Sequence, residues 1–327
     1  MQQRELGRGG PLVSAIGLGC LSFGGIFGTT DRAASLGALD AAWEAGITFY
    51  DTANIYGAGV SETMLGDWLA DRGHRAVVAT KVGIVTTPPR GFNNSAAYIR
   101  AELEASLRRL RTDHVALYYI HRRQPEIEIE EVAGTMARLV EEGKIGGYGL
   151  SEVAPYTIRR AHAVHPVRAV QNEYSLWTRL PELGVTRACA DLGIAFVPFS
   201  PLGRGMLSDA QPDPSLMGEG DIRRTMPRFM APNFAANVAA IDGFRAFAAA
   251  RGVTTAALAL AWVLDRGADM IPIPGTRTAS HLREWLGADA LVLSDSDRAE
   301  IDRLLPPGFA HGDRYDAAQN VGPERFA

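Results

Sequence analysis

Short apolar runs rich in β-branched and aromatic residues recur along the chain and predict eight β-strands. They cover residues 15–20, 47–51, 77–81, 115–121, 146–151, 169–171, 194–200 and 270–274. Between several of these runs, apolar residues recur at helical spacing. One stripe is Met64, Leu65, Trp68 and Leu69, the next is Ile99, Leu103, Leu107 and Leu110, and the third is Val132, Met136, Leu139 and Val140. Gly143, just after the third stripe, is expected to end that helix.

The predicted strands end at residues 20, 51, 81, 121, 151, 171, 200 and 274. Most of these intervals are close to the roughly 30 residues that one βα unit occupies. A chain of 327 residues could also form two domains. Eight alternating units instead predict a parallel sheet closed into a (β/α)8 TIM barrel, with residues 1–327 in a single domain.

Three segments fall outside this repeat. Residues 4–6 and 12–14 predict a small N-terminal β-hairpin, placed at the bottom of the barrel. Residues 203–232 are rich in glycine and proline and follow a strand end, which indicates a long loop that acts as a lid over the barrel mouth. A disordered insertion is the alternative for that segment. Residues 307–327 form a polar tail that either covers the mouth or extends freely into solvent.

Charge and composition exclude several classes of function. The 33 Lys and Arg against 37 Asp and Glu give a net charge of −4, which does not attract nucleic acid. The longest apolar stretch, residues 256–264, is too short for a membrane helix, and no secretory signal precedes the barrel, so we expect a cytoplasmic protein without a membrane partner. Cys20 and Cys189 predict neither a disulfide framework nor a metal site. No heptad repeat or apolar face indicates an oligomeric state.

Polar side chains stand at most of the predicted strand ends, where TIM barrels carry their chemistry. The residues at these ends are Cys20, Asp51, Lys81, His121, Ser151, Gln171, Ser200 and Gly275. Each one alone has an ordinary structural explanation, such as a turn cap or a buried histidine. Together at one barrel mouth they predict an active site.

Tyr56 lies five residues after Asp51 and can fold back over this mouth. A phenol titrates near pH 10. An ammonium about 4 Å away interacts with its anion by roughly 4 kcal/mol at an effective dielectric of 20, so Lys81 is expected to lower the pKa of Tyr56 by a unit or more. Asp51 would keep Lys81 charged, and His121 would bind the same substrate oxygen. This set predicts reduction of a small aldehyde or ketone with Tyr56 as general acid.

Groups that could hold a nicotinamide cofactor follow the later strands. Ser151, Glu152 and Gln171 offer hydrogen bonds to a carboxamide, and Phe199 offers a flat apolar face. The loop at residues 271–277 leads into a predicted helix, so a phosphate could use Arg277 and helix-terminal amides. The sequence contains no GxGxxG fingerprint, so a dinucleotide would bind without one.

Seven segments resemble the aldo-keto reductases, in order and over nearly the whole chain. They are residues 49–57 (FYDTANIYG), 79–81 (ATK), 118–122 (YYIHR), 149–152 (GLSE), 170–174 (VQNEY), 199–203 (FSPLG) and 272–276 (PIPGT). The GLSE segment is similar to the bacterial and plant branch of the family. The resemblance implies an NADPH-dependent carbonyl reductase with Tyr56 as general acid, Lys81 and Asp51 tuning it, and His121 orienting the carbonyl.

The resemblance also implies where the cofactor would lie. Gly19, Cys20 and Leu21 would lie near the nicotinamide ribose, with Asp51 beside them. Ser151, Glu152 and Gln171 would hold the carboxamide, Phe199 would stack on the ring, and Ser200, Pro201, Leu202, Gly203 and Arg204 would wrap the pyrophosphate. Pro274 and Gly275 lead to Thr276 and Arg277, which would meet the 2′-phosphate, and Glu284 would lie at the adenine end. Arg277 is the one strongly basic residue available for a phosphate in that segment, so NADH stays open as an alternative to NADPH. Trp285 stands where relatives commonly have Asn after the glutamate.

Two other functions are compatible with these residues. A class I aldolase would use Lys81 as a Schiff-base nucleophile, since barrels support that chemistry too. Asp51 weighs against it by keeping the lysine protonated. A non-catalytic regulatory subunit that retains the cofactor site, like the channel-associated β subunits that resemble this family, is the second alternative.

Overall fold

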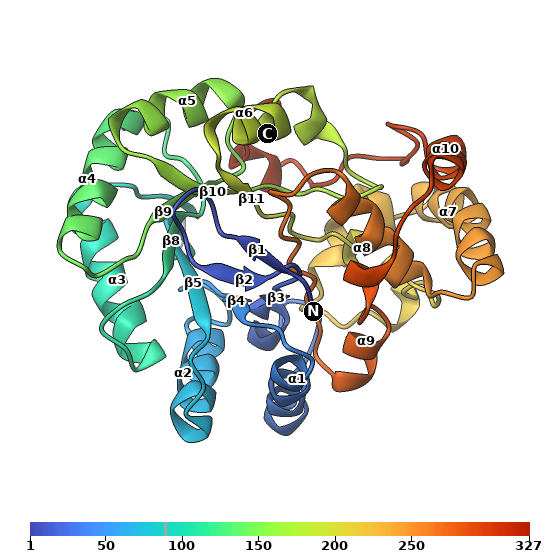
Figure 1. The fold of residues 1–327 in the computed structure, drawn as a ribbon, viewed down its shortest axis with the longest axis horizontal. Helices are drawn as coiled ribbons and strands as arrows, with labels where there is room; N and C mark the ends of the chain where they lie inside the picture. Colours follow the sequence, from blue (N-terminus) through green and yellow to red (C-terminus); the bar gives the residue numbers. More distant parts are fainter. Residues whose placement is uncertain (88–89) are drawn as a thin grey trace.

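The computed structural model describes residues 1–87 and 90–327. Seven parallel strands form one curved sheet in the order β11-β10-β9-β8-β5-β4-β3. Their bounds are β3 Leu18–Gly19, β4 Phe49–Asp51, β5 Val77–Val82, β8 Leu117–Ile120, β9 Tyr148–Ser151, β10 Val167–Gln171 and β11 Ala195–Phe196. Helices surround this sheet (Figure 1). The predicted (β/α)8 barrel is thereby confirmed.

The eighth side of the barrel is closed by residues 270–275, which pair with both edge strands through isolated parallel bridges. Pro272 and Pro274 have no N–H, so this segment cannot form a continuous ladder. Its remaining backbone N–H and C=O groups nevertheless form hydrogen bonds with the segments on both sides of it. The amide of Ile271 donates to Phe196 O at 2.9 Å, and the Pro272 carbonyl accepts from Gly17 N at 2.9 Å. The two edges of the sheet are thereby joined.

The helices begin and end where local sequence favours it. Their bounds are α1 Arg32–Glu44, α2 Val60–Arg72, α3 Ala96–Leu110, α4 Ile129–Glu141, α5 Pro155–Val164, α6 Val185–Leu192, α7 Asn233–Ala250, α8 Thr255–Asp265, α9 Ala279–Arg283 and α10 Asp295–Leu304. Asp31 caps α1 by accepting from two backbone amides, and Gly143 follows α4 with a φ of 72°, as expected. No single described helix is long and apolar enough to cross a membrane, whereas α7 and α8 pass such a test as a pair bent by 93°.

A small apolar cluster fills the inside of the barrel, separate from the larger layer between sheet and helices. It contains Phe49 and Leu117 from the strands and Val197 just after β11, together with Leu6 and Val13 from the N-terminal hairpin. That hairpin pairs β1 (Gln3–Glu5) with β2 (Leu12–Ser14). Leu6 and Val13 therefore close the bottom of the barrel, in agreement with the sequence-based expectation.

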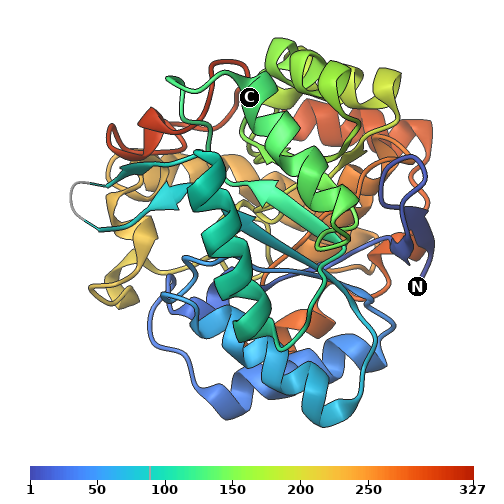
Figure 2. The ribbon, with the colours of Figure 1, turned by 90° about the vertical axis from the view of Figure 1, so that its left-hand side faces the viewer.

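Three segments gather at the opposite end of the barrel, at the side of Figure 2 away from the N-terminus. The first is a hairpin of β6 (Ile84–Val85) and β7 (Gly91–Phe92). The second, residues 203–232, folds into the 3₁₀ turns η3 Gly203–Gly205, η4 Pro214–Leu216, η5 Ile222–Thr225 and η6 Pro227–Phe229. The third is the C-terminal tail, residues 307–327, with η8 at Gln319–Val321. All three contribute residues to the same cavity.

Candidate active site

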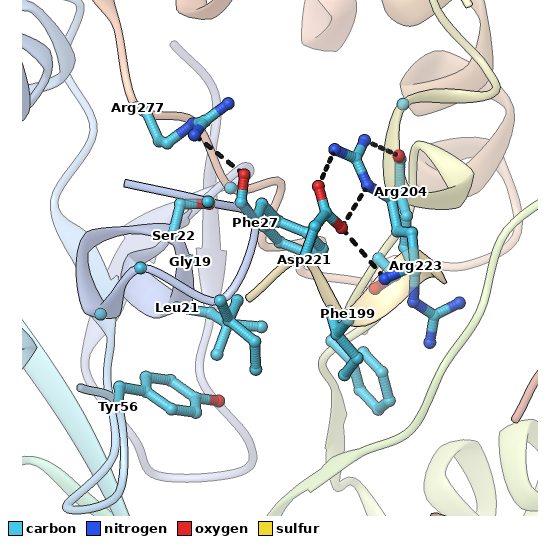
Figure 3. A pocket seen from close by; sticks show the side chains of 18 of the residues that line it. Gly19, Leu21, Ser22, Phe27, Tyr56, Phe199, Arg204, Asp221, Arg223 and Arg277 are labelled. Atoms are coloured by element: carbon cyan, nitrogen blue, oxygen red, sulfur yellow. Dashed lines mark hydrogen bonds and ion pairs between the residues drawn. The ribbon is translucent and has the colours of Figure 1, made fainter. Parts of the chain in front are cut away.

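A cavity of about 1600 Å³ opens at the carboxyl ends of the barrel strands. Single drug-sized ligands usually occupy sites of roughly 300–1,000 Å³. The cavity therefore has room for a large ligand and a small one together. Figure 3 shows Tyr56 and Phe199 toward one end of it and Arg277 apart from them, beside Phe27.

Tyr56, Lys81 and Asp51 form a connected set of contacts at the floor of the cavity, in which Lys81 and Asp51 are buried and Tyr56 is half-buried. Lys81 Nζ lies 3.2 Å from Tyr56 Oη, donates to Thr52 O at 2.8 Å and forms an ion pair with Asp51. Asp51 Oδ2 also accepts from Gln171 Nε2 at 2.8 Å. Neighbouring parallel strands β4 and β5 supply the carboxylate and the ammonium, so the barrel fixes their separation.

The pKa of Lys81 agrees with the expectation from the sequence, and the pKa of Tyr56 differs from it. Burial alone would lower the pKa of Lys81, but the charges and hydrogen bonds of Asp51 and Tyr56 together outweigh it, so that pKa is raised and the ammonium persists. Burial also raises the pKa of Tyr56 above that of a free phenol, and the opposing charge of Lys81 offsets only part of the effect. The predicted net lowering of the pKa of Tyr56 was wrong, because desolvation of the phenolate outweighs its attraction to the ammonium. Tyr56 is thus a phenol that holds its proton at neutral pH.

His121 stands beside Tyr56, with ring centroids 5.8 Å apart and the rings nearly perpendicular. Burial, followed by the positive charges of Arg122 and Lys81, holds the pKa of His121 well below its ordinary value. Its imidazole is therefore neutral at pH 7. Nδ1 is buried and has no hydrogen-bond partner within the described chain. Tyr56 and His121 thus present polar groups to one small region of the cavity.

Most residues expected to hold a cofactor line this same cavity. They are Gly19, Leu21, Asp51, Ser151, Gln171, Phe199, Ser200, Pro201, Leu202, Arg204, Pro274, Gly275, Thr276, Arg277 and Glu284. The segments that carry them come from opposite ends of the sequence and meet because the barrel closes. Arg277 Nη1 donates to Phe27 O at 2.9 Å, which holds this arginine against the loop after β3.

Comparison with known proteins agrees with this geometry. Residues 15–306 match the description "Aldo/keto reductase family". The chain belongs to the aldo/keto reductase family. It is 40% identical over 315 residues to "Aldo-keto reductase yakc [NADP(+)]" of Schizosaccharomyces pombe, covering 94% of this chain and 93% of that one. It is 39% identical over 319 residues to "Probable aldo-keto reductase 1" of Glycine max, covering 96% and 92%. The family assignment made from the sequence is confirmed.

Solved structures of the family share the fold of this aldo/keto reductase. A glycerol dehydrogenase from Gluconobacter oxydans superimposes with a TM-score of 0.85 at 29% identity, covering 93% of this chain and 94% of that one. An aldo-keto reductase from Klebsiella pneumoniae in complex with NADPH gives 0.74 at 27% identity, covering 97% and 99%. Both comparisons extend over more than nine-tenths of this chain.

Three expected cofactor residues of this aldo/keto reductase do not line the cavity. Cys20 begins the 3₁₀ helix η1 (Cys20–Gly24), and its buried thiol contacts Leu18 O within the core. A Cβ on Gly203 would lie 2.7 Å from the ring of Trp177, so this glycine packs against that indole. Glu152 turns away with a φ of 56° and is held by both terminal nitrogens of Arg314. These three positions therefore serve packing and loop anchoring.

Arg204 reaches the cavity, but its guanidinium is already paired. It makes a two-pronged contact with Glu173, at 2.7 and 2.8 Å, and its Cζ lies 5.3 Å from the ring centre of Tyr315. Burial would raise the pKa of Glu173, but Arg204 and Arg314 lower it to about 2. The charge of this arginine is therefore engaged within the described chain, where it anchors its loop to Glu173 and to the tail.

Sequence reasoning gave no role to several residues of the site. Arg122 was part of a recognised segment but was not singled out. Tyr315 lies in the tail, and Asp221 and Arg223 lie in residues 203–232, where they form an ion pair at 2.6 Å. The glycine- and proline-rich composition of that loop was the available signal for its position, but no periodic pattern indicated which of its side chains face inward.

Proposed function

We propose that this aldo/keto reductase reduces the carbonyl group of small aldehydes or ketones to alcohols, with NADPH as the reductant and Tyr56 as the general acid. The observation that carries the proposal is the contact between Tyr56 Oη and Lys81 Nζ at 3.2 Å, beside a neutral His121. When bound, the reduced nicotinamide supplies a hydride to the carbonyl carbon. The alkoxide that forms takes its proton from the Tyr56 hydroxyl.

The neighbouring residues make this proton available at neutral pH. Lys81 stabilises the negative charge that develops on the Tyr56 oxygen, because its ammonium is within hydrogen-bond distance. Asp51 keeps that ammonium charged and in place. Since Lys81 and Asp51 are buried, their charges act through a low dielectric. His121 orients the carbonyl oxygen by hydrogen bonding as a neutral imidazole.

The residues present fit a nicotinamide carboxamide at the same end. Ser151 Oγ accepts from Arg122 at 3.1 Å, so its hydroxyl hydrogen is available to donate. Gln171 donates its Nε2 to Asp51, and its amide oxygen is not engaged within the described residues, so it can accept. One donor and one acceptor match the two polar atoms of a carboxamide. Phe199 would cover the ring.

The other end fits the anionic half of a dinucleotide. Ser200 and Arg204 adopt positive φ angles of 49° and 56°, and such turns aim backbone amides at an anion. Thr276 and Arg277 would bind the 2′-phosphate, with Glu284 toward the adenine. The names of the Schizosaccharomyces pombe relative, with NADP(+), and of the Klebsiella pneumoniae complex, with NADPH, support this choice of cofactor. NADH is the alternative that the test below includes.

Residues 203–232 are proposed to act as a lid over this cofactor. The amide of Ile222 donates to Ile26 O at 3.1 Å, and Arg223 lies over the ring of Phe27 at 5.2 Å. Ile26 and Phe27 belong to the loop after β3, on the other side of the cavity. A dinucleotide between these loops would be enclosed, and its release would require the lid to move.

The two alternatives fit less well. A Schiff-base aldolase needs a neutral amine that reaches substrate, whereas Lys81 is buried, paired with Asp51 and bonded to Thr52 O. A regulatory subunit has no need of a proton donor tuned by a lysine.

The proposal is tested by following nicotinamide absorbance with a panel of aldehydes, ketones and sugars, each with NADPH and with NADH. We expect oxidation of NADPH that depends on the carbonyl compound. Borohydride trapping in the presence of a carbonyl compound provides the counter-test, because covalent labelling of Lys81 supports the aldolase instead. Tight NADPH binding without turnover on any carbonyl compound supports the regulatory subunit.

A further inference from the structure

The arginines around the cavity differ in whether a carboxylate neutralises them. Arg204 is paired with Glu173, and Arg223 is paired with Asp221. Arg122 also lines the cavity, next to His121, and within the described residues it forms no ion pair with an acidic side chain. It is therefore a positive charge at the catalytic end whose counterion the described chain does not supply.

The position of this guanidinium is fixed by the fold. Arg122 Nη1 donates to His121 O at 2.6 Å and to Ser151 Oγ at 3.1 Å. The aliphatic part of Arg122 packs beside Gly322 of the tail and the ring of Phe92. A Cβ added to Gly322 would lie 3.1 Å from Arg122 Cδ and 3.1 Å from the ring of Phe92. An arginine has five N–H donors. Nε and Nη2 of Arg122 make no hydrogen bond within the described chain, which leaves one edge of the fork for a ligand.

The charges nearby make this end of the cavity electropositive. Among Tyr56, Lys81, Asp51 and His121, Asp51 is the acidic residue, and its charge is already balanced by the ion pair with Lys81. The other acidic residues that line the cavity belong to the lid or to the region of α9. Arg90, after β6, adds another positive charge that acts on His121, and Arg122 acts on both His121 and Tyr56. Reduction of a neutral carbonyl does not require this excess of positive charge.

The cofactor does not account for the charge either. Its phosphates are assigned above to the loop at Ser200 and to Arg277, which lies apart from Tyr56 in Figure 3. A nicotinamide carboxamide needs one donor and one acceptor, which Ser151 and Gln171 provide. The remaining component of the reaction is the carbonyl substrate.

We propose that the substrate of this protein carries a carboxylate near its reacting carbonyl group, and that the free edge of Arg122 binds this carboxylate. The planar fork of arginine matches two carboxylate oxygens, which fixes orientation as well as charge. With the carboxylate on Arg122, the carbonyl group lies toward His121 and Tyr56. The inference rests on the proposed function and narrows its substrate class to aldehyde acids and keto acids.

The test compares substrates that differ only in this charge. 3-Formylbenzoate and 4-formylbenzoate are each compared with their methyl esters, at saturating NADPH, and kcat/KM is measured for all four. A hydrogen bond to a charged group contributes roughly 1.5–3 kcal/mol, or about ten- to a hundredfold. We expect at least one acid to exceed its ester by about tenfold or more, and this ratio to fall as ionic strength rises.

Substitution of Arg122 identifies the residue responsible. In Arg122→Met the ratio of acid to ester should fall toward one, and in Arg122→Lys it should stay intermediate. The matched control is Arg108→Met, which removes the same charge from an exposed site on α3 and should keep the parent ratio. The salt dependence of the unmodified protein needs no variant, so it remains a test even where a substitution impairs folding.

The outcomes separate the two proposals. Equal kcat/KM for acids and esters, or a ratio in Arg122→Met that equals the parent ratio, overturns the carboxylate assignment alone. If NADPH is oxidised with none of these compounds nor with any aldehyde or ketone of the larger panel, the proposed reductase function fails as well. A preference for the esters overturns the inference and shows that the cavity rejects anionic substrates.

Discussion

The ammonium of Lys81 lies 3.2 Å from the hydroxyl of Tyr56, and the two side chains come from consecutive βα units of the barrel. β5 delivers the lysine, and the loop after β4 delivers the tyrosine. Burial holds the proton on the phenol, whereas the adjacent positive charge stabilises the anion that would form on proton transfer. Burial thus keeps Tyr56 protonated at rest, and the contact with Lys81 makes its proton transferable.

Replacing the phenol removes the proposed proton donor without disturbing the cavity. We expect Tyr56→Phe to lower kcat for carbonyl reduction by about a hundredfold or more, in the range of general acid catalysis. NADPH binding, followed by fluorescence titration, should be retained. Tyr98→Phe, at a tyrosine on α3 outside the cavity, is the matched control and should keep parent activity. Parent turnover by Tyr56→Phe would remove Tyr56 from the mechanism.

Lys81 and Asp51 should depend on one another for stability. Lys81→Met leaves the carboxylate of Asp51 buried without its partner, and such a loss destabilises proteins by about 3–5 kcal/mol. The double variant Lys81→Met with Asp51→Asn removes the stranded charge as well. We therefore expect urea denaturation to give a higher free energy of unfolding for the double variant than for Lys81→Met. Equal or lower stability of the double variant would mean that this pair is not electrostatically coupled.

The barrel and the composition of its mouth could be predicted because both follow from local sequence. Strand ends such as Asp51, Lys81 and His121 share one edge whenever parallel strands close into a barrel. Cys20 departed from this rule because β3 ends at Gly19, and the turn into η1 directs the next side chain into the core. A one-residue difference in where a strand ends reverses the direction of a side chain.

Long-range pairing could not be predicted in the same way. Glu152 and Arg314 are 162 positions apart, and no local pattern links them. Their contact depends on the path of the tail over the barrel mouth. The pKa of Tyr56 also escaped prediction, because its direction depends on how completely the phenol is desolvated, which only the assembled cavity determines.

The neutral state of His121 gives the stability of the protein a pH dependence. Because the pKa of His121 in the folded protein is well below its ordinary value near 6.5, the unfolded chain binds this proton first as pH falls. The free energy of unfolding should therefore decrease below about pH 6.5, by up to about 1.4 kcal/mol per pH unit from this group. His121→Gln should show a shallower decrease in the same urea titrations between pH 7 and pH 5. Parallel decreases in the two proteins would assign the effect to other groups.

Arg277 should decide between the two dinucleotides. One of its nitrogens is held by Phe27 O, so its remaining N–H groups are positioned beside the end of the cavity assigned to the 2′-phosphate. We expect Arg277→Ala to raise the Kd for NADPH about ten- to a hundredfold, as for the loss of a charged hydrogen bond, and to leave the Kd for NADH nearly unchanged, because NADH has no 2′-phosphate. Fluorescence titration with each dinucleotide measures both constants. Arg224→Ala removes an exposed arginine of the lid that does not line the cavity and should retain the parent preference. An unchanged ratio of the two constants in Arg277→Ala would mean that the 2′-phosphate is bound by other residues.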